Sequence, residues 1–202
     1  MHRIVFATAN AGKLKEIHQI LQDTGLEIIS MAEAGVDTDI VEDGSTFEEN
    51  ALIKARTVAA HTDGVVIADD SGLCVDALQG EPGVYSARYL GEDTPYEEKN
   101  AKIIERLSGV KKEDRTARFV CAMAIIFPDK SEKVVKGIIE GYIGYEPVGE
   151  NGFGYDPIFY VDDLGTSTAN ISPEEKNAIS HRGKALRMIR EELKSHADTG
   201  LK

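Results

Sequence analysis

The chain has 202 residues, and its 23 Lys and Arg against 35 Asp and Glu give a formal net charge of −12. This length can bury a substantial core, and we expect one domain over residues 1–202, which can be bilobed. The acidic balance argues against nucleic-acid polymers and anionic membranes as partners, but not against a small anionic substrate, because a cleft can gather a few cationic side chains and a divalent cation.

The cysteines and the N-terminus indicate where the protein works. Cys74 and Cys121 lie in apolar stretches outside any C-x-x-C or Cys/His ligand pattern, so we expect buried thiols. The apolar runs are too short to cross a bilayer, and the first residues, MHRIVFATAN, enter a strand-like segment without a secretory signal. We therefore expect a cytoplasmic enzyme or binding protein.

The first part of the chain predicts a strand, a loop, a helix and a second strand. Residues 3–7 are apolar and β-branched, and after the small-residue loop TANAGK apolar residues recur at helical spacing up to Leu21. Residues 26–30 predict the second strand. Beyond an acidic loop, Ser45 and Glu48 predict a capping box for another helix. That helix places four apolar side chains on one face: Phe47, Ala51, Ala55 and Val58.

The middle of the chain predicts a short strand followed by a helix. Residues 65–68 indicate a brief apolar strand that runs into a turn, DDSG. Chemistry at the C-terminal end of a strand is common in α/β sheets. Thr94 as N-cap, with Pro95 and Glu97 behind it, predicts a helix to about Leu107.

The last part predicts a hairpin, an irregular loop and two helices. Segments 117–127 and 133–145 flank the turn-like PDKSE and predict an antiparallel hairpin, so the sheet is mixed. The glycine-rich GENGFGYDP cannot form regular structure and precedes a short strand at 158–160, which makes it a candidate functional loop. Ser172 begins one helix with a further N-cap, proline and acid pattern. After SHRG, a last helix turns four apolar side chains inward: Ala185, Leu186, Ile189 and Leu193.

The loop before the first helix is a candidate phosphate site. It consists of Thr8, Ala9, Asn10, Ala11, Gly12 and Lys13. Backbone N–H groups at a helix start favour an anion, Lys13 adds a mobile positive charge, and the Asn10 side chain can hydrogen-bond a phosphate or ribose oxygen. The spacing is not that of a Walker A loop, and an ordinary strand-to-helix turn explains the segment equally well.

The segment Asp69-Asp70-Ser71-Gly72 supplies two neighbouring carboxylates. Adjacent strand residues point to opposite sides, so if the strand persists one acid is catalytic and its neighbour supports it. Such a carboxylate can hold magnesium or accept a proton from an attacking water. D-D-S-G is also a common turn composition, and taken alone the segment favours a solvated turn.

Two further segments can form a base pocket: Phe153-Gly154-Tyr155-Asp156-Pro157 and Ser180-His181-Arg182-Gly183. Aromatic rings on a glycine-rich loop can stack on a planar base. Asp156 can accept from a ring N–H, and His181 and Arg182 can donate to a keto oxygen, which favours a 6-keto purine over adenine. A core Phe, a structural Tyr and a His-Arg pair at a helix dipole are the simpler explanations of the separate residues.

Four polar residues near the second helix are weaker candidates. Asn50 and Lys54 stand four apart and share a helix face, which is either directed into a cleft or solvated. Glu42 and Asp43 could bring metal-binding oxygens, although a simple acidic loop explains them as well.

Taken together, five ordered motifs resemble the inosine triphosphate pyrophosphatase family, also called the HAM1-like or RdgB-like noncanonical purine triphosphate pyrophosphatases. The motifs are FATANAGKLKE, EDGSTFEENALIKA, IADDSGLCVDAL with GEPGVYSARY, GFGYDPIF and EEKNAISHRGKAL. The match spans nearly the whole chain. It implies an α/β fold whose mixed, elongated central sheet is flanked by helices, with two lobes around a nucleotide cleft. It also implies a homodimer and Mg²⁺-dependent hydrolysis of XTP, ITP and dITP to the monophosphate and pyrophosphate.

The resemblance also implies roles for individual residues. Thr8 to Lys13 would bind the phosphates, Asp70 would accept a proton and hold magnesium, and Ser71 would contact the substrate. The base and sugar site would consist of Phe153, Gly154, Tyr155, Asp156, Lys176, His181 and Arg182. Relatives carry a metal-binding acid where this chain has Val41, and Glu42 or Asp43 can substitute for it.

The residues and the resemblance lead to one mechanistic hypothesis. Asp70, helped by magnesium, activates a water that attacks a phosphorus of the triphosphate, while Lys13 and Lys54 stabilise the departing pyrophosphate. Two alternatives stay open: a Maf-like pyrophosphatase for modified pyrimidines or methylated nucleotides, and a regulator that binds nucleotides without cleaving them.

Overall fold

The computed structural model describes residues 3–8, 10–22 and 25–199. Within these residues the chain forms seven β-strands, five α-helices and several short 3-10 helices. The chain divides into two compact units, each built from separate segments. Unit 1 comprises residues 1–70, 121–137 and 181–202, and unit 2 comprises residues 71–120 and 138–180.

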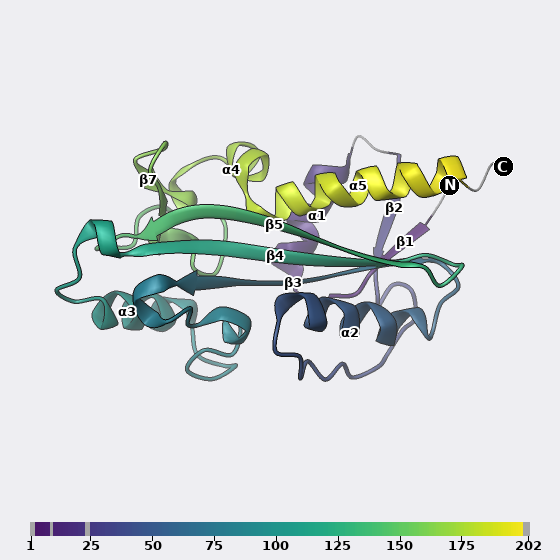
Figure 1. Cartoon of the computed structure of the whole chain (residues 1–202), viewed down its shortest axis with the longest axis horizontal. Coiled ribbons are helices and arrows are strands. Elements are labelled where there is room, and N and C mark those ends of the chain that lie inside the picture. The colour runs from purple at the N-terminus through teal and green to yellow at the C-terminus, as the bar shows by residue number, and fades with distance from the viewer. Residues whose placement is uncertain (1–2, 9, 23–24, 200–202) are drawn as a thin grey trace. The chain divides into compact units, whose positions relative to one another are not determined.

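The strands form a mixed sheet, as predicted. They are β1 (Arg3–Phe6), β2 (Glu27–Ser30), β3 (Val65–Val75), β4 (Thr116–Ile126), β5 (Glu132–Ile143), β6 (Phe159–Val161) and β7 (Thr166–Ser167). Hydrogen-bonded neighbours follow the order β2-β1-β3-β4-β5-β6-β7 (Figure 1). β1 is parallel to β2 and β3, with Ile4 opposite Ile28 and Val65, whereas β6 is antiparallel to β5 and β7. β4 and β5 are neighbours joined by residues 127–131, which confirms the hairpin, because so short a connection reverses the chain.

The predicted helices are all present. They are α1 (Ala11–Leu21), α2 (Phe47–Ala59), α3 (Tyr96–Arg106), α4 (Pro173–Ile179) and α5 (His181–Thr199). The starts of α2, α3 and α5 differ from prediction. The α4 capping box of Ser172 and Glu175 is confirmed. The Thr94 cap of α3 is wrong: Pro95 occupies the N-cap position, and the Thr94 hydroxyl donates to the Leu90 carbonyl oxygen at 2.7 Å.

The capping box of α2 lies one residue later than predicted. Thr46 and Glu49 form it, not Ser45 and Glu48. The sequence fits both a Ser45/Glu48 and a Thr46/Glu49 capping box. The second one forms, because one carboxylate oxygen of Glu49 accepts from both the Ser45 backbone at 2.7 Å and the Thr46 backbone at 3.2 Å. The predicted buried face of α2 is confirmed.

Strand β3 does not end at residue 68 but continues to Val75, so the predicted DDSG turn is wrong. Asp and Gly are disfavoured in strands. The strand nevertheless persists, because Asp69 and Asp70 are both buried and paired with cationic side chains.

Helix α5 begins at His181, so residues 181–183 form its first turn and do not precede the helix. Gly137 in β5 permits this arrangement. A Cβ added there would lie 2.1 Å from the His181 carbonyl oxygen and 2.7 Å from the Ala185 nitrogen. No larger residue leaves room for the first turn of α5 against β5.

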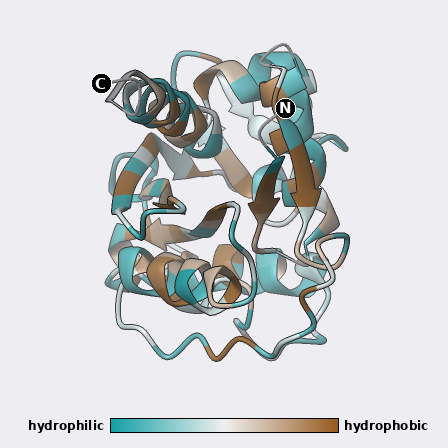
Figure 2. Ribbon diagram, turned by 90° about the vertical axis from the view of Figure 1, so that its right-hand side faces the viewer, coloured by the Kyte–Doolittle hydropathy of each residue, from teal (hydrophilic) through white to brown (hydrophobic). Residues whose placement is uncertain are grey.

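The core of unit 1 is formed by β1, β3, β4, α1 and α5. Its buried apolar residues include Ile4, Phe6, Ile17, Leu21, Ile67, Met123, Ile125, Leu186 and Ile189. The predicted inward residues of α5 are confirmed, with Leu193 partly buried at the edge of this core. Figure 2 shows the amphipathic pattern as alternating brown and teal bands along α5, the helix that ends near the label C.

Unit 2 has a separate core of its own. Its buried residues include Leu73, Val75, Ile103, Leu107, Ala117, Ile139, Ile143, Tyr155, Ile158 and Phe159. They come from the second half of β3, from α3, from segments of β4 and β5, and from the glycine-rich loop and the start of β6. β3 and β4 contribute buried residues to both cores, and β5 adds the partly buried Val135 to the core of unit 1. Cys121 is buried as predicted, whereas Cys74 is half-buried. Among residues 3–8, 10–22 and 25–199, no helix combines the length and apolarity that a membrane crossing requires.

Candidate active site

The phosphate-loop candidate has the predicted strand, loop and helix arrangement. β1 ends at Phe6 and α1 begins at Ala11, with Asn10 as its N-cap. The Asn10 side-chain oxygen accepts from the Lys13 backbone at 3.1 Å, and the Thr8 hydroxyl oxygen accepts from the Asn10 backbone at 3.1 Å. These two bonds shape the loop so that the exposed start of α1 offers N–H groups to an anion. Ala9 lies outside the described residues.

The two neighbouring carboxylates of β3 have different partners. Asp69 Oδ2 lies 2.9 Å from Lys13 Nζ, whereas Asp70 Oδ1 lies 3.5 Å from Lys54 Nζ. This separation follows from the persistence of the strand, because successive side chains of a strand point to opposite faces. Both carboxylates are buried, which excludes the solvated turn.

Asp70 belongs to a cluster that α2 and the acidic loop build around it. Asn50 Nδ2 donates to Asp70 Oδ2 at 3.2 Å, and the Asn50 side-chain oxygen accepts from the Gly44 backbone at 2.9 Å. Lys54 Nζ lies 2.7 Å from Glu42 Oε2 as well as near Asp70. Asn50 and Lys54 are both buried, so their shared helix face is not a solvated one.

Glu42, not Asp43, is the acid that this cluster includes. Glu42 is half-buried and paired with Lys54, while Asp43 and Val41 are exposed. Gly44 lets the acidic loop approach α2, because an added Cβ would lie 2.7 Å from the Asn50 side-chain oxygen. Of the two acids that the sequence left open, the structure therefore brings Glu42 to Lys54.

Burial and charge act against each other on the ionisable groups of this cluster. Burial raises the pKa of Asp70, although Lys54 and Lys13 oppose the shift. Burial alone would lower the pKa of Lys54, but the charges of Asp70, Asp69 and Glu42 outweigh it and leave the pKa raised. A carboxylate with a raised pKa next to a permanently charged ammonium is suited to accept a proton and to stabilise an anion.

Asp69 lies in a second cluster of unit 1, formed with α1 and α5. Arg182 is almost fully buried; its NH1 pairs with Glu16, and its NH2 lies 3.5 Å from Asp69 Oδ2. The neighbouring carboxylates raise the pKa of Arg182 despite its burial. His181, the first residue of α5, is buried too. The predicted base contact of Arg182 stays a prediction, because its guanidinium engages two carboxylates here.

The glycine-rich loop in unit 2 is organised around Asp156. This buried carboxylate accepts from Lys176 Nζ at 2.6 Å, from the Phe153 backbone at 2.8 Å and from the Thr168 hydroxyl at 2.9 Å. Lys176 Nζ also lies 5.0 Å from the centroid of the Phe153 ring. Gly152 permits this packing, because an added Cβ would lie 2.2 Å from Asp156 Oδ2.

Three residues that the sequence did not single out support this loop from α3 and its surroundings. Asn100 Nδ2 donates to the Gly154 carbonyl oxygen at 3.1 Å, and the Tyr96 ring meets the Tyr155 ring edge-on at 5.2 Å. The Tyr155 hydroxyl donates to the Ser86 carbonyl oxygen at 2.7 Å. Burial raises the pKa of Tyr155, so its hydroxyl stays a donor. A polar residue on a helix face carries no signal of such a contact in a single sequence.

The predicted site residues thus form two clusters in unit 1 and one in unit 2. In unit 1, Asp70 lies with Lys54 and Glu42, whereas Lys13 of the phosphate loop and Arg182 meet at Asp69. Unit 2 brings together Phe153 to Asp156 and Lys176. Ser71 is half-buried at the start of the unit 2 segment of β3. No three His, Cys, Asp or Glu side chains gather as a ready-made metal site in the described part of the chain.

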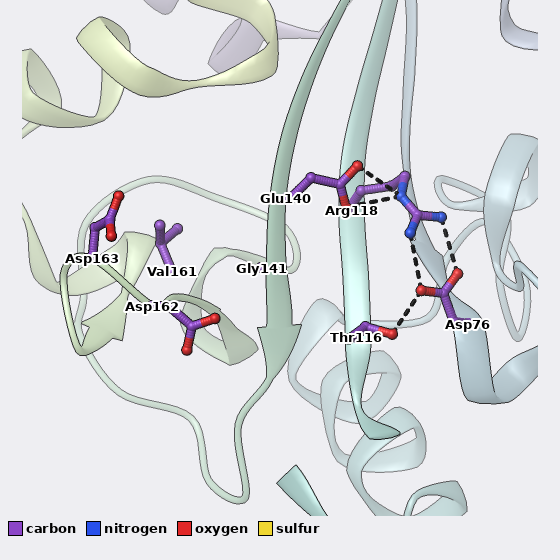
Figure 3. A pocket seen from close by; sticks show the side chains of 8 residues that line it. All are labelled: Asp76, Thr116, Arg118, Glu140, Gly141, Val161, Asp162 and Asp163. Atoms are coloured by element: carbon purple, nitrogen blue, oxygen red, sulfur yellow. Dashed lines mark hydrogen bonds and ion pairs between the residues drawn. The ribbon is translucent and has the colours of Figure 1, made fainter. Parts of the chain in front are cut away.

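A hollow of about 370 Å³ within unit 2 is made of other residues (Figure 3). Its lining consists of Asp76, Thr116, Arg118, Glu140, Gly141, Val161, Asp162 and Asp163. Arg118 is held between Asp76 at 2.9 Å and Glu140 at 3.0 Å, as the dashed lines in Figure 3 show. With four acids against this single paired arginine, the hollow repels a triphosphate.

Comparison with known proteins identifies close relatives. A model of the Ham1 family matches residues 4–192. The dITP/XTP pyrophosphatase of Bacillus subtilis is 50% identical over 189 residues, which cover 94% of this chain and 96% of that protein. The dITP/XTP pyrophosphatase of Bacillus licheniformis matches with the same identity and coverage.

Solved structures of similar proteins have the same fold. The structure of a HAM1 protein from Coxiella burnetii has a TM-score of 0.87 at 44% identity and covers 96% of this chain and 100% of that one. A nucleoside-triphosphatase, dITP/XTP pyrophosphatase, from Mycobacterium abscessus has a TM-score of 0.74 at 42% identity, covering 93% of this chain and 98% of that one. These likenesses confirm the predicted α/β fold with its mixed sheet.

Proposed function

Because the chain belongs to the Ham1 family, we propose that it hydrolyses the noncanonical purine nucleoside triphosphates XTP, ITP and dITP to the monophosphate and pyrophosphate. This activity cleanses the nucleotide pool. The names of the Bacillus relatives support the substrate class. The observation that carries the proposal is the buried Asp70 with Lys54 and Glu42 beside it, because hydrolysis of an anhydride needs a base and a cation close together.

Asp70 acts as the proton acceptor. It takes a proton from a water whose oxygen attacks a phosphorus of the triphosphate, and the anhydride bond to pyrophosphate breaks. Asn50, which donates to the other Asp70 oxygen, orients the carboxylate. Lys13 and Lys54 stabilise the charge on the departing pyrophosphate.

The remaining site residues bind the substrate. The loop from Thr8 to Lys13 holds the phosphates at the start of α1, and Ser71 contacts the substrate. The Phe153 ring stacks on the base, held in place by Asp156 and its hydrogen bonds. Gly154, Tyr155, Lys176, His181 and Arg182 complete the base and sugar site.

The donor set of the Asp70 cluster fits a divalent cation. Mg²⁺ prefers oxygen ligands and is commonly held by one or two carboxylates together with substrate phosphates. Asp70 and Glu42 supply such oxygens on either side of Lys54. Bound Mg²⁺ would supply Lewis-acid polarisation of the phosphoryl oxygens and lower the pKa of a bound water. Family resemblance further supports a homodimer and a cytoplasmic location as parts of the proposal.

Initial rates on a panel of triphosphates test the proposal. With magnesium, pyrophosphate release from ITP, XTP and dITP should far exceed release from GTP, ATP, dTTP and UTP, and removal of the metal should abolish it. Faster turnover of modified pyrimidines would favour a Maf-like specificity. Nucleotide binding without any turnover would indicate a regulator and overturn the proposed activity.

Asp70→Asn tests the base. This change keeps the shape of the side chain but removes its proton affinity, so turnover should fall by about 10²-fold or more while the fold is retained. Asp63→Asn makes the same chemical change at an exposed position just before β3 and should leave the rate unchanged. Circular dichroism of both variants checks the fold, and full activity of Asp70→Asn would remove Asp70 from the mechanism.

A further inference from the structure

Four charged side chains of unit 1 form a chain of ion pairs that reaches from the interior to the phosphate loop. Arg182 pairs with Glu16 of α1 through NH1 and approaches Asp69 of β3 through NH2. Asp69 in turn pairs with Lys13, which stands one helical turn before Glu16 on α1. The side chains of Arg182 and Glu16 are 2% and 11% exposed, and that of Lys13 is 15% exposed.

Lys13 and Arg182 share a single carboxylate oxygen. Asp69 Oδ2 lies 2.9 Å from Lys13 Nζ but 3.5 Å from Arg182 NH2. The arginine therefore stands at the outer limit of a hydrogen bond to an oxygen that the lysine occupies. A buried guanidinium is stabilised by carboxylates, so without Glu16 the Arg182 guanidinium would move closer to Asp69.

We propose that Glu16 is a positioning residue that holds Arg182 back from Asp69 and so keeps Lys13 at its place beside β3. The role of Lys13 in binding the triphosphate rests on the proposed function. The ion-pair chain itself does not depend on it. Glu16 touches no substrate in this proposal and acts through Arg182 and Asp69.

Glu16→Gln tests the effect on Lys13 without any need for turnover. Neutralising Glu16 removes the carboxylate that holds Arg182 NH1, so the guanidinium moves closer to Asp69 Oδ2, weakens the pair of that oxygen with Lys13 and leaves Lys13 more accessible. Competitive labelling with an amine-acylating reagent, read by mass spectrometry in the absence of nucleotide, should show Lys13 modified roughly threefold faster or more. Lys15, exposed on the same helix, is the internal standard and should not change.

A double-mutant cycle with Lys13→Ala separates positioning from general stability. If Glu16 acts on catalysis through Lys13, its removal lowers kcat/KM about 10- to 100-fold in the parent, but it adds little once Lys13 is gone. If Glu16→Gln lowers kcat/KM by the same factor in the parent and in Lys13→Ala, the proposal is overturned, because a merely structural role would weaken both proteins equally. Glu191→Gln makes the same change in an exposed ion pair of α5 and should leave both labelling and kcat/KM unchanged.

Glu16→Asp covers the case in which Glu16→Gln does not fold. It keeps the charge but shortens the reach by one methylene, so Lys13 labelling should lie between the parent and the neutral variant. Unchanged Lys13 labelling in both variants would overturn the proposal. An inactive parent enzyme would instead contradict the proposed function and leave the labelling result standing.

Discussion

Asp69 and Asp70 are chemically identical neighbours, and their surroundings separate them. Asp69 is fully buried between Lys13 and Arg182, so its charge is balanced by two cations of the protein. Asp70 is slightly exposed, and burial raises its pKa against the opposing charge of Lys54. A carboxylate whose pKa is raised is the better proton acceptor, which favours Asp70 for this role.

A pH dependence of stability is predicted for Asp76. Hydrogen bonds from Arg118 and from Thr116 hold the pKa of this carboxyl below its usual range. Because folding lowers the pKa, this group stabilises the protein above its unfolded value of about 3.9, and the contribution is lost as the pH falls through the folded pKa. Arg118→Met should therefore raise the pKa of Asp76 toward its ordinary value in an NMR titration of the carboxyl carbon.

The control for this prediction is Lys102→Met, which removes an exposed ion pair with Glu105 elsewhere in unit 2. It should leave the Asp76 titration unchanged. An unaltered Asp76 pKa in Arg118→Met would show that the contact in Figure 3 does not govern this carboxyl.

At the scale of elements, the regular parts of the fold were predictable and the interrupted strand was not. Periodicity and caps located all five helices, with errors of one residue at Thr46 and at Pro95, and with α5 beginning at His181 instead of after Gly183. β3 was missed beyond residue 68, because D-D-S-G has turn composition and the cations that satisfy its acids lie far away in sequence. A local pattern does not contain such tertiary pairing.

The glycine-rich loop allows a prediction with a matched control. Gly152 and Gly154 both have positive φ, at 74° and 67°. A Cβ on Gly152 would collide with Asp156, whereas one on Gly154 would meet only the Tyr96 ring at 3.5 Å. Gly154→Ala should therefore cost the backbone strain alone, about 1–2 kcal/mol, in urea unfolding.

Gly152→Ala should cost more than Gly154→Ala, because it also disrupts the buried pair of Asp156 and Lys176. It should also weaken nucleotide binding in calorimetry, since the Phe153 backbone is held by the same carboxylate. Equal losses in both variants would mean that the close approach to Asp156 does not matter.

Across the whole chain, the sequence identified candidate residues that the structure gathers into clusters, but it did not reveal the contacts that these residues make. The motifs pointed to Asp70, Lys54, Glu42 and Asp156, and the structure places each in a buried cluster. The hydrogen bond from Asn100 to the glycine-rich loop could not be predicted from the sequence, because an Asn within a helix carries no periodic or motif signal. The single domain and the nucleotide cleft stay predictions.

The net charge gives a prediction for the intact protein. At −12 the surface should repel duplex DNA, so a fluorescently labelled duplex should show no saturable change in anisotropy at about 50 mM salt. A salt series is the control, because binding that appears and then weakens with added salt would reveal an unforeseen basic surface. That outcome would contradict the exclusion of nucleic-acid polymers as partners.

Because β3 is continuous from Val65 to Val75, the position of a residue along the strand decides which face of the sheet its side chain points to. Successive residues of a strand face opposite ways, so deleting or inserting one residue between Val65 and Asp69 would turn both acids to the other face of the sheet. A deletion would put Asp70 at the place of Asp69, beside Lys13 and Arg182, and an insertion would put Asp69 at the place of Asp70, beside Lys54. A substitution in this strand therefore changes one side chain, whereas a change of its length upstream of the acids moves both carboxylates away from their cationic partners.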